Sequence, residues 1–409
     1  MSTTLGSRKV WLYWAAGMAW FYLLLWPLMG IGADGAVSFA DSLAVWGYVA
    51  AASAALLALR QLHARGAFAA VTSPLARGLA GAKTGMDKVP PAVWWSLALC
   101  IAAALPFGSG RYVQDVAINV LIYICLGLGL NVVIGLCGLL DLGYIAFYGV
   151  GAYTYALLSI HYAMPFWMAL PVAAALAAVA GCIIGYPTLR MRGDYLAIVT
   201  LGFGEIVRLI LNNWMALTNG PNGILGIRPP TAWWPSFEGT FGFELIQMKK
   251  LTALYFVILG LTVLTTIAVH RLNFSRIGRA WEAIREDETA AELMGVNTFR
   301  LKLLAYATGA VFGGLAGAFF AARMRFVSPE SFTFIESAMV LAMVVLGGMG
   351  SIPGVMLGAL ALVALPEVFR QFELYRMLAF GGAMTVMMLF RPKGLWPAKR
   401  FGARSEEMD

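Results

Sequence analysis

The sequence predicts an all-α polytopic membrane protein, a bundle of about 10 to 12 transmembrane helices with glycine-broken or re-entrant segments. Of its 409 residues 60% are hydrophobic and only 12% are charged, which is more apolar surface than one soluble core could hide. The apolar residues fall into runs, most of them about 20 residues long, the length that crosses a hydrocarbon core. Since backbone groups in lipid must be hydrogen-bonded within the protein, we expect these runs to be helices.

The individual spans follow from the positions of these runs, many of which are interrupted by Gly or Pro. The expected spans are residues 11–32, 43–59, 93–109, 116–135, 141–160, 165–186, 195–214, 251–269, 300–322, 336–349, 354–372 and 376–390. We expect 11–32 to be an uncleaved first span, because it is longer than the core of a signal peptide.

The formal net charge of +8 indicates topology rather than nucleic-acid binding, because the basic residues are spread over short loops. A cytoplasmic amino terminus places most loop Lys and Arg inside, and the opposite loops 33–42 and 161–164 hold none, as the positive-inside rule requires. Both termini are then expected in the cytoplasm. The cytoplasmic segments would be 1–10, 60–92, 187–194, 270–299 and 391–409.

Two parts of the chain are distinguished by their connections. We interpret residues 1–92 as a two-span extension with a basic cytoplasmic linker at 60–92, and residues 93–409 as the core. Segment 215–250 contains the turn-forming stretches "TNGPNG" and "RPPTAWWP", whose aromatic residues suit an external membrane interface.

Glycine is concentrated in three clusters, and two explanations stay open. Gly309, Gly313 and Gly317 share one helix face, which favours close helix crossing. Alternatively, the first and third clusters mark broken or re-entrant helices, as in a translocation path. The clusters occupy 127–153, 309–317 and 347–358.

Ionisable side chains within or next to the spans need an explanation, since a central charge costs about 3 kcal/mol on insertion scales. Glu205 and Arg208 lie three residues apart and form either a structural ion pair or part of the solute path. Asp141 either caps a helix or faces the path. We attribute Glu336 to solvation at the membrane interface.

Neutral polar groups could also serve a polar solute. Asn131, Tyr144 and Tyr148 could donate hydrogen bonds to it, although bonding between helices is the alternative. The candidate path residues are therefore Asn131, Asp141, Tyr144, Tyr148, Glu205 and Arg208.

Catalytic and cofactor sites are not predicted. His63, His161 and His270 are far apart, so a metal site or catalytic residues are not expected. In "GLAGAKT" Ala82 interrupts the Gly-Lys pair that a phosphate loop needs. We expect no cofactor on this chain, so any energy input would have to come from an ion gradient or from a partner.

The charged stretch at 276–295 predicts an amphipathic helix pair on the cytoplasmic side. Ile277, Trp281 and Ile284 recur at helical spacing. Asp287 is placed to cap a second short helix that ends at Gly295 as a left-handed residue. This pair is either a solvated surface or a docking surface.

The docking interpretation depends on small residues beside apolar ones. Ala290, Ala291 and Gly295 would let two surfaces approach closely, next to Met294, which suits a groove on a partner. The candidate docking residues are Glu282, Asp287, Ala290, Ala291, Met294 and Gly295.

The same stretch resembles a known family. "TAAELMG" looks like the coupling loop of ABC importer permeases, whose pattern is Glu-Ala-Ala, three residues, Gly, with Thr289 as a departure. The whole region 116–396 is similar to permeases for branched-chain amino acids, and the two-span extension is similar to that of the longer permease in the high-affinity leucine, isoleucine and valine system. The stretches that carry this likeness include "GLNVVIGLCGLLDLGYIAFYGVGAY", "LRMRGDYLAIVTLGFGEIVRLILNN", "VLGGMGS" and "LFRPKGL".

The resemblance implies a permease subunit that imports branched-chain and possibly other amino acids across a bacterial inner membrane. Its partners would be a second, homologous permease, two cytoplasmic ATPases that hold ATP and Mg, and a periplasmic amino-acid-binding protein. Permeases for urea, amides or other amino acids have similar motifs and are the alternatives in this class. An ion-gradient-driven secondary transporter is the alternative from another class.

Overall fold

The computed structural model describes residues 91–189, 191, 193–236, 242–247, 250–368 and 394–396, besides isolated positions 15, 43, 47, 50, 54 and 381. The chain divides into two compact units, Met1–Leu97 and Ala98–Asp409. Nearly all described residues belong to the second unit. Apart from the isolated positions, the linker 60–92 and the expected spans 11–32, 43–59 and 376–390 lie outside the described residues.

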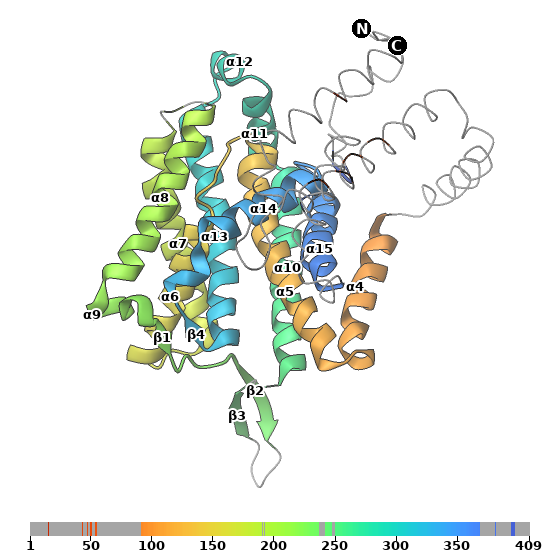
Figure 1. Cartoon of the computed structure of the whole chain (residues 1–409), viewed down its shortest axis with the longest axis vertical. Helices are drawn as coiled ribbons and strands as arrows, with labels where there is room; N and C mark the ends of the chain where they lie inside the picture. The colour runs from red at the N-terminus through yellow and green to blue at the C-terminus, as the bar shows by residue number, and fades with distance from the viewer. Residues whose placement is uncertain are drawn as a thin grey trace, which may run out of the picture. The chain divides into compact units, whose positions relative to one another are not determined.

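Helices dominate the described part, which confirms an all-α polytopic membrane protein (Figure 1). In this part six helical segments are long and apolar enough to cross a membrane, and α4 and α15 contribute shorter apolar helices. The helices are α4 Pro91–Gly108, α5 Arg111–Asn131, α6 Ile145–His161, α7 Phe166–Thr188, α8 Asp194–Asn213, α9 Met215–Thr218, α10 Leu251–Asn273, α11 Arg276–Glu286, α12 Glu288–Leu293, α13 Thr298–Met324, α14 Phe334–Gly347 and α15 Ile352–Val368.

Helix α13 lies at the centre of the core, where it packs against α5, α6 and α7. The approach is close because the contact positions are glycines. A Cβ atom at Gly317 would lie 2.0 Å from the carbonyl oxygen of Tyr148, and one at Gly309 would lie 3.1 Å from that of Gly129. The prediction that this glycine face supports close helix crossing is therefore confirmed.

Helix α5 does not continue smoothly into α6. It ends in a π-helical turn, Val132–Leu136, and residues 137–144 form a non-helical link before α6. The expected continuous span 141–160 was thus wrong at its beginning. The reason is steric: a Cβ atom at Gly143 would lie 2.1 Å from the carbonyl oxygen of Thr200 in α8. We refer to residues 132–144 as the helix break.

The third glycine cluster forms a tight antiparallel hairpin of α14 and α15. A Cβ atom at Gly347 would lie 2.3 Å from the carbonyl oxygen of Gly354, and one at Gly358 would lie 2.2 Å from that of Met343. Gly348 turns the chain at φ 117°, which only glycine adopts readily. Helix α14 has 14 residues, and only together with the preceding 3-10 turn Pro329–Phe332 does it form one of the six segments long enough to cross a membrane. The expectation of interrupted helices at the first and third clusters is confirmed.

Two short antiparallel ladders were not predicted. Strand β1 (Ile224–Leu225) pairs with β4 (Phe326–Val327). Strand β2 (Thr231–Ser236) pairs with β3 (Gly242–Gln247), in the segment where turns alone were expected. This hairpin and the α11–α12 pair lie at opposite ends of the second unit (Figure 1).

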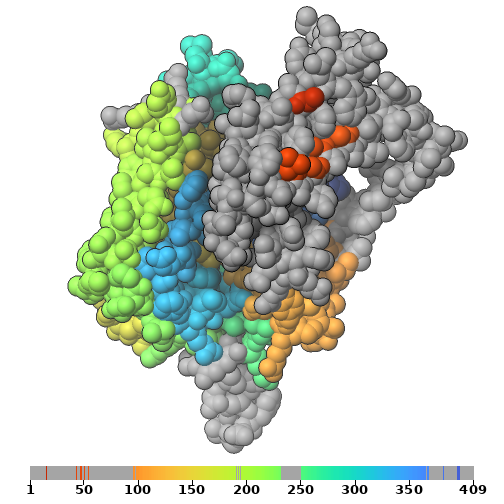
Figure 2. All heavy atoms as spheres, viewed as in Figure 1, coloured from red at the N-terminus to blue at the C-terminus, as the bar shows by residue number. Residues whose placement is uncertain are grey.

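Helix α8 forms one edge of the described part, beside α14 (Figure 2). Its outer side chains are large and apolar, and Ile198, Ile206 and Leu209 are all exposed. An apolar, exposed face on a 20-residue helix is what lipid contact requires.

Candidate functional site

The α11–α12 pair forms as the sequence predicts, and its caps explain why. Asp287 accepts hydrogen bonds from the backbone N–H groups of Thr289 and Ala290, at 2.8 and 3.0 Å. Gly295 has φ 85° and ends α12, with its N–H donating to Glu292 O at 2.9 Å and that of Val296 to Ala291 O at 3.1 Å. This is a Schellman ending, so the predicted roles of Asp287 and Gly295 in the two caps are confirmed.

The apolar face of α11 packs inside this chain. Trp281 is fully buried and Ile284 is 4% exposed. The Trp281 Nε1–H donates to the carbonyl oxygen of Leu301 in α13 at 2.7 Å. Lys302 of α13 pairs with Glu288 of α12, with Nζ 2.5 Å from Oε1. The helix pair is therefore fixed to α13, and these residues are not available to a partner.

The exposed surface of α12 lies at its carboxyl end. Leu293 and Met294 are 83% and 85% exposed, and Ala290 and Gly295 are exposed beside them. A Cβ atom at Gly295 would meet no atom within 4 Å. We call these four residues the α12 tip. Two large apolar side chains this exposed at an aqueous end favour a protein contact.

Other predicted docking residues lie elsewhere. Ala291 is 5% exposed and belongs to the core, so its expected place on a partner surface is corrected: its small side chain lets α12 approach its own chain. Asp287 is exposed and occupied with capping, and Glu282 is half-buried. Sequence reasoning missed Leu293, although its spacing from Ala290 places both on one helix face.

The inner side of α11 contacts the helix break. The Arg285 guanidinium donates to the carbonyl oxygen of Gly135, and a Cβ atom at Gly138 would lie 2.9 Å from the Arg285 Cγ. The break in turn contacts the α14–α15 turn, because a Cβ atom at Gly135 would lie 2.6 Å from the Gly350 nitrogen. Just before the break, Asn131 Oδ1 accepts a hydrogen bond from Gly350 N–H at 2.8 Å. One continuous set of contacts thus joins α11, the break and the α14–α15 hairpin.

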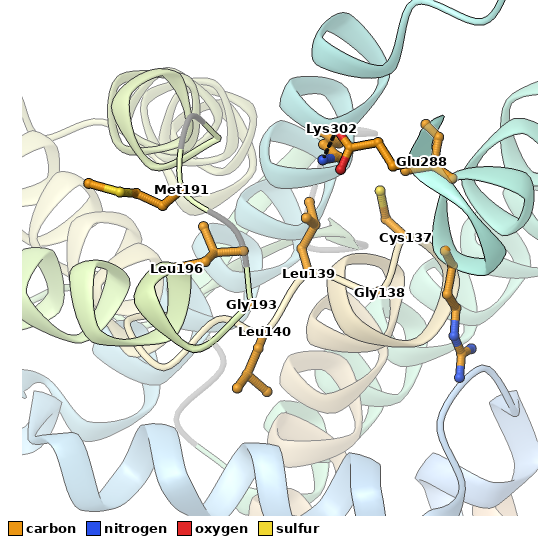
Figure 3. Close-up of a pocket in the computed structure, with 11 residues that line it drawn as sticks. Cys137, Gly138, Leu139, Leu140, Met191, Gly193, Leu196, Glu288 and Lys302 are labelled. Carbon is orange, nitrogen blue, oxygen red and sulfur yellow. Dashed lines mark ion pairs between the residues drawn. The ribbon is translucent and has the colours of Figure 1, made fainter. Parts of the chain in front are cut away.

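A cavity of about 270 Å³ lies between the helix break and the α11–α12 pair (Figure 3). Its walls come from the helix break, the α7–α8 link, α8, α11, α12 and α13. The lining residues are Cys137, Gly138, Leu139, Leu140, Met191, Gly193, Leu196, Ile284, Arg285, Glu288 and Lys302. The Glu288–Lys302 pair closes one side of the cavity.

Three candidate path residues gather at or next to the helix break. Asn131, Asp141 and Tyr144 are each no more than 1% exposed. Tyr144 donates to Gly309 O at 2.9 Å, and Asp141 Oδ1 accepts from Gly143 N–H at 2.9 Å. Asp141 thus stabilises a turn before α6 rather than capping the helix itself. Within the described residues, Asp141 Oδ2 and Asn131 Nδ2 are buried without a hydrogen-bond partner.

The other candidates do not join this group. Glu205 and Arg208 form the expected ion pair on α8, with Nε 2.8 Å from Oε2 and both side chains about one-third exposed. Tyr148 packs among aromatic rings, 5.3 Å from that of Phe320 and 5.4 Å from that of Phe332. Glu336, attributed to interface solvation, is partly exposed and also accepts a 2.5 Å hydrogen bond from the Tyr123 hydroxyl.

Comparison with known proteins identifies the family. The family model described as branched-chain amino acid transport system / permease component matches residues 112–390. The chain belongs to this family of permeases. It is therefore a multi-pass membrane transport subunit rather than an enzyme, in agreement with its apolar helices.

Individual relatives have the same character. The chain is 51% identical to the high-affinity branched-chain amino acid transport system permease protein LivM of Escherichia coli (strain K12). The alignment extends over 314 residues, which are 74% of this chain and 74% of that protein. The chain is 28% identical over 193 residues to the corresponding LivH permease of that strain, covering 46% of this chain and 60% of LivH. A probable LivM of Methanocaldococcus jannaschii is 25% identical over 247 residues, 57% of this chain and 68% of that protein. No solved structure matches the chain.

Proposed function

We propose that this permease is one membrane subunit of an ATP-driven importer that carries leucine, isoleucine and valine from the periplasm to the cytoplasm. The observation that carries the proposal is the α12 tip, an exposed apolar end of a helix pair that is rigidly fixed to the transmembrane core. Family membership supports the substrate class, since the relatives named above are branched-chain amino acid permeases.

In this proposal the α12 tip inserts into a groove on a cytoplasmic ATPase. Two such ATPases bind ATP and Mg, and closing of their dimer displaces α11 and α12. The displacement reaches α13 through Trp281 and the Lys302–Glu288 pair. It reaches the helix break through Arg285. The cavity between these elements leaves room for the break to rearrange.

The remaining partners complete the importer. A second, homologous permease forms the other half of the translocation path, and a periplasmic amino-acid-binding protein delivers solute at the end that carries the β2–β3 hairpin. The protein lies in the inner membrane with both termini in the cytoplasm. Affinity resides mainly in the binding protein, so few polar groups are needed in the path.

Reconstitution tests the proposal. The chain is co-expressed with the products of neighbouring genes, purified and placed in proteoliposomes, and uptake of labelled leucine is measured in competition with isoleucine, valine, alanine, phenylalanine and urea. We expect uptake that needs ATP and is competed by isoleucine and valine. Competition by urea alone would assign the chain to the amide permeases, and uptake by the chain alone under an ion gradient would make it a secondary transporter.

A further inference from the structure

Helix α5 carries a line of polar side chains along one face. Asp115, Asn119 and Tyr123 follow each other at intervals of four residues, so they share one side of the helix. Asn131, the last residue of α5, lies eight residues beyond Tyr123 and about 80° further round the helix, so it is not part of this face. We call Asp115, Asn119 and Tyr123 the α5 stripe. It begins at the end of the unit far from α12 (Figure 1).

The stripe is matched by two charged residues from other helices. Arg323, at the end of α13, has Nη2 2.6 Å from Asp115 Oδ1 and Nη1 2.6 Å from Asn119 Oδ1. Glu336, at the start of α14, accepts the hydrogen bond from Tyr123. The Arg323 side chain is only 7% exposed although its partner Asp115 is 52% exposed. A cation and an anion thus lie over neighbouring turns of one helix.

An aromatic wall stands next to these charges. Tyr148 of α6 packs edge-on against Phe332 and tilted against Phe320. Phe320 lies three residues before Arg323 on α13, and Phe332 lies four residues before Glu336, so the rings that contact Tyr148 come from the same two parts of the chain as the two charges. We refer to these charges and rings as the cluster. The buried hydroxyl of Tyr153, whose ring lies 6.1 Å from that of Phe332, has no hydrogen-bond partner among the described residues.

The charge balance of the cluster is incomplete. Three ion pairs join described residues, and Glu336 takes part in none of them. Its hydrogen-bond partner, the Tyr123 hydroxyl, is neutral. A carboxylate in a transmembrane helix is costly unless a cation compensates it. The Arg323 guanidinium has five N–H donors in a plane, a geometry that suits a carboxylate. Two of its nitrogens donate hydrogen bonds to Asn119 and Asp115 of the α5 stripe.

We propose that this cluster is an entry site for the zwitterionic amino acid. Arg323 binds the α-carboxylate in exchange with Asp115, and Glu336, which is partly exposed, binds the α-ammonium. The aromatic wall, whose rings Tyr148 and Phe332 are buried, bounds the site on one side. The inference rests on the proposed function and refines it, because it selects amino acids over uncharged amides by their two charged groups.

The test uses the complete importer in proteoliposomes with saturating binding protein and labelled L-leucine. The variants are Arg323→Gln and Glu336→Gln. The controls Arg325→Gln and Glu330→Gln make the same charge changes at exposed residues nearby. We expect at least a tenfold loss of leucine transported per ATP hydrolysed in the two cluster variants, about the effect of losing one charge-assisted hydrogen bond. The controls should stay within about twofold, a difference too small to reflect such a loss.

A second pair of substitutions distinguishes binding of the amino acid from a purely structural ion pair between α5 and α13. Exchanging the partners, Asp115→Arg with Arg323→Asp, restores the ion pair but moves the cation. We expect uptake to stay low, and restored uptake would overturn the inference. If the Gln variants fail to assemble, Arg323→Lys and Glu336→Asp are measured instead. We expect them to assemble with reduced uptake, and failed assembly there would assign the cluster a purely structural role. Absence of amino-acid uptake by the unaltered complex would instead refute the proposed function.

Discussion

Replacing Gly295 tests the docking role of the α12 tip with a matched pair of variants. Gly295 has φ 85°, where a residue with a Cβ costs about 1–2 kcal/mol. Both Gly295→Ala and Gly295→Arg carry this strain. Neither adds a clash within the chain, because the Cβ position is open to 4 Å. The strain is small against the roughly 5–15 kcal/mol that stabilise a folded protein, so both variants should insert and fold.

The two variants should therefore differ only in the side chain that residue 295 presents to the ATPase. The arginine projects a long cation beside Leu293 and Met294, which are more than 80% exposed, and it must be desolvated if an apolar groove covers it. We expect Gly295→Arg to lose ATPase co-purification and at least 90% of ATP-driven uptake, a tenfold effect equal to about 1.4 kcal/mol. Gly295→Ala should keep most of both. Equal behaviour of the two variants, or normal uptake with arginine, would refute the docking role.

Of three further predictions, two concern the contacts behind the tip and the third concerns the ion pair on α8. Arg285→Ala removes the hydrogen bond to Gly135, so ATPase binding should stay intact while uptake falls about tenfold, as expected for a charge-assisted bond of about 1.5–3 kcal/mol. The control is Arg279→Ala, on the exposed side of α11. A normal ratio of uptake to ATP hydrolysis in Arg285→Ala would contradict the idea that Arg285 transmits the ATPase movement to the helix break. Trp281→Ala leaves a cavity at a fully buried site and removes the hydrogen bond to the Leu301 carbonyl, so we expect the free energy of unfolding to fall by about 3–5 kcal/mol. The thermal midpoint of the purified subunit should be lower, and an unchanged midpoint would contradict the packing. Glu205→Ala leaves an unpaired cation on α8 and should lower the abundance of the protein in the membrane without changing its substrate ranking. Immunoblots measure the abundance, and competition uptake measures the ranking. An altered ranking at normal abundance would make Glu205 a residue of the solute path.

Much of the fold follows from apolar runs and glycine spacing. Helices α5, α7, α8, α10 and α13 begin and end near the predicted residues, because a bilayer fixes both the length and the polarity of a span. The caps at Asp287 and Gly295 were predictable because they depend on local backbone chemistry.

Features that depend on distant contacts were not predictable. Nothing in the apolar run around Gly143 reveals that its backbone lies against Thr200, so the link before α6 was predicted to end at residue 140 rather than at residue 144. Ala291 was misplaced because a small residue fits both a surface that contacts a partner and the core of its own chain, so its identity does not distinguish the two. Arg323 and Asp115 lie one residue outside the predicted spans, so they were not weighed as membrane residues, although long side chains reach back along a helix end.

The most direct test of the central claim is a photo-crosslink from the α12 tip. A benzophenone side chain replaces Met294 in one sample and Leu225 in another; Leu225 is 71% exposed and lies in β1, away from α12 (Figure 1). The full complex is irradiated in membranes. We predict an adduct between position 294 and the ATPase subunit whose yield changes when ATP is added, and no ATPase adduct from position 225. An ATPase adduct from 225 but none from 294 would contradict the account.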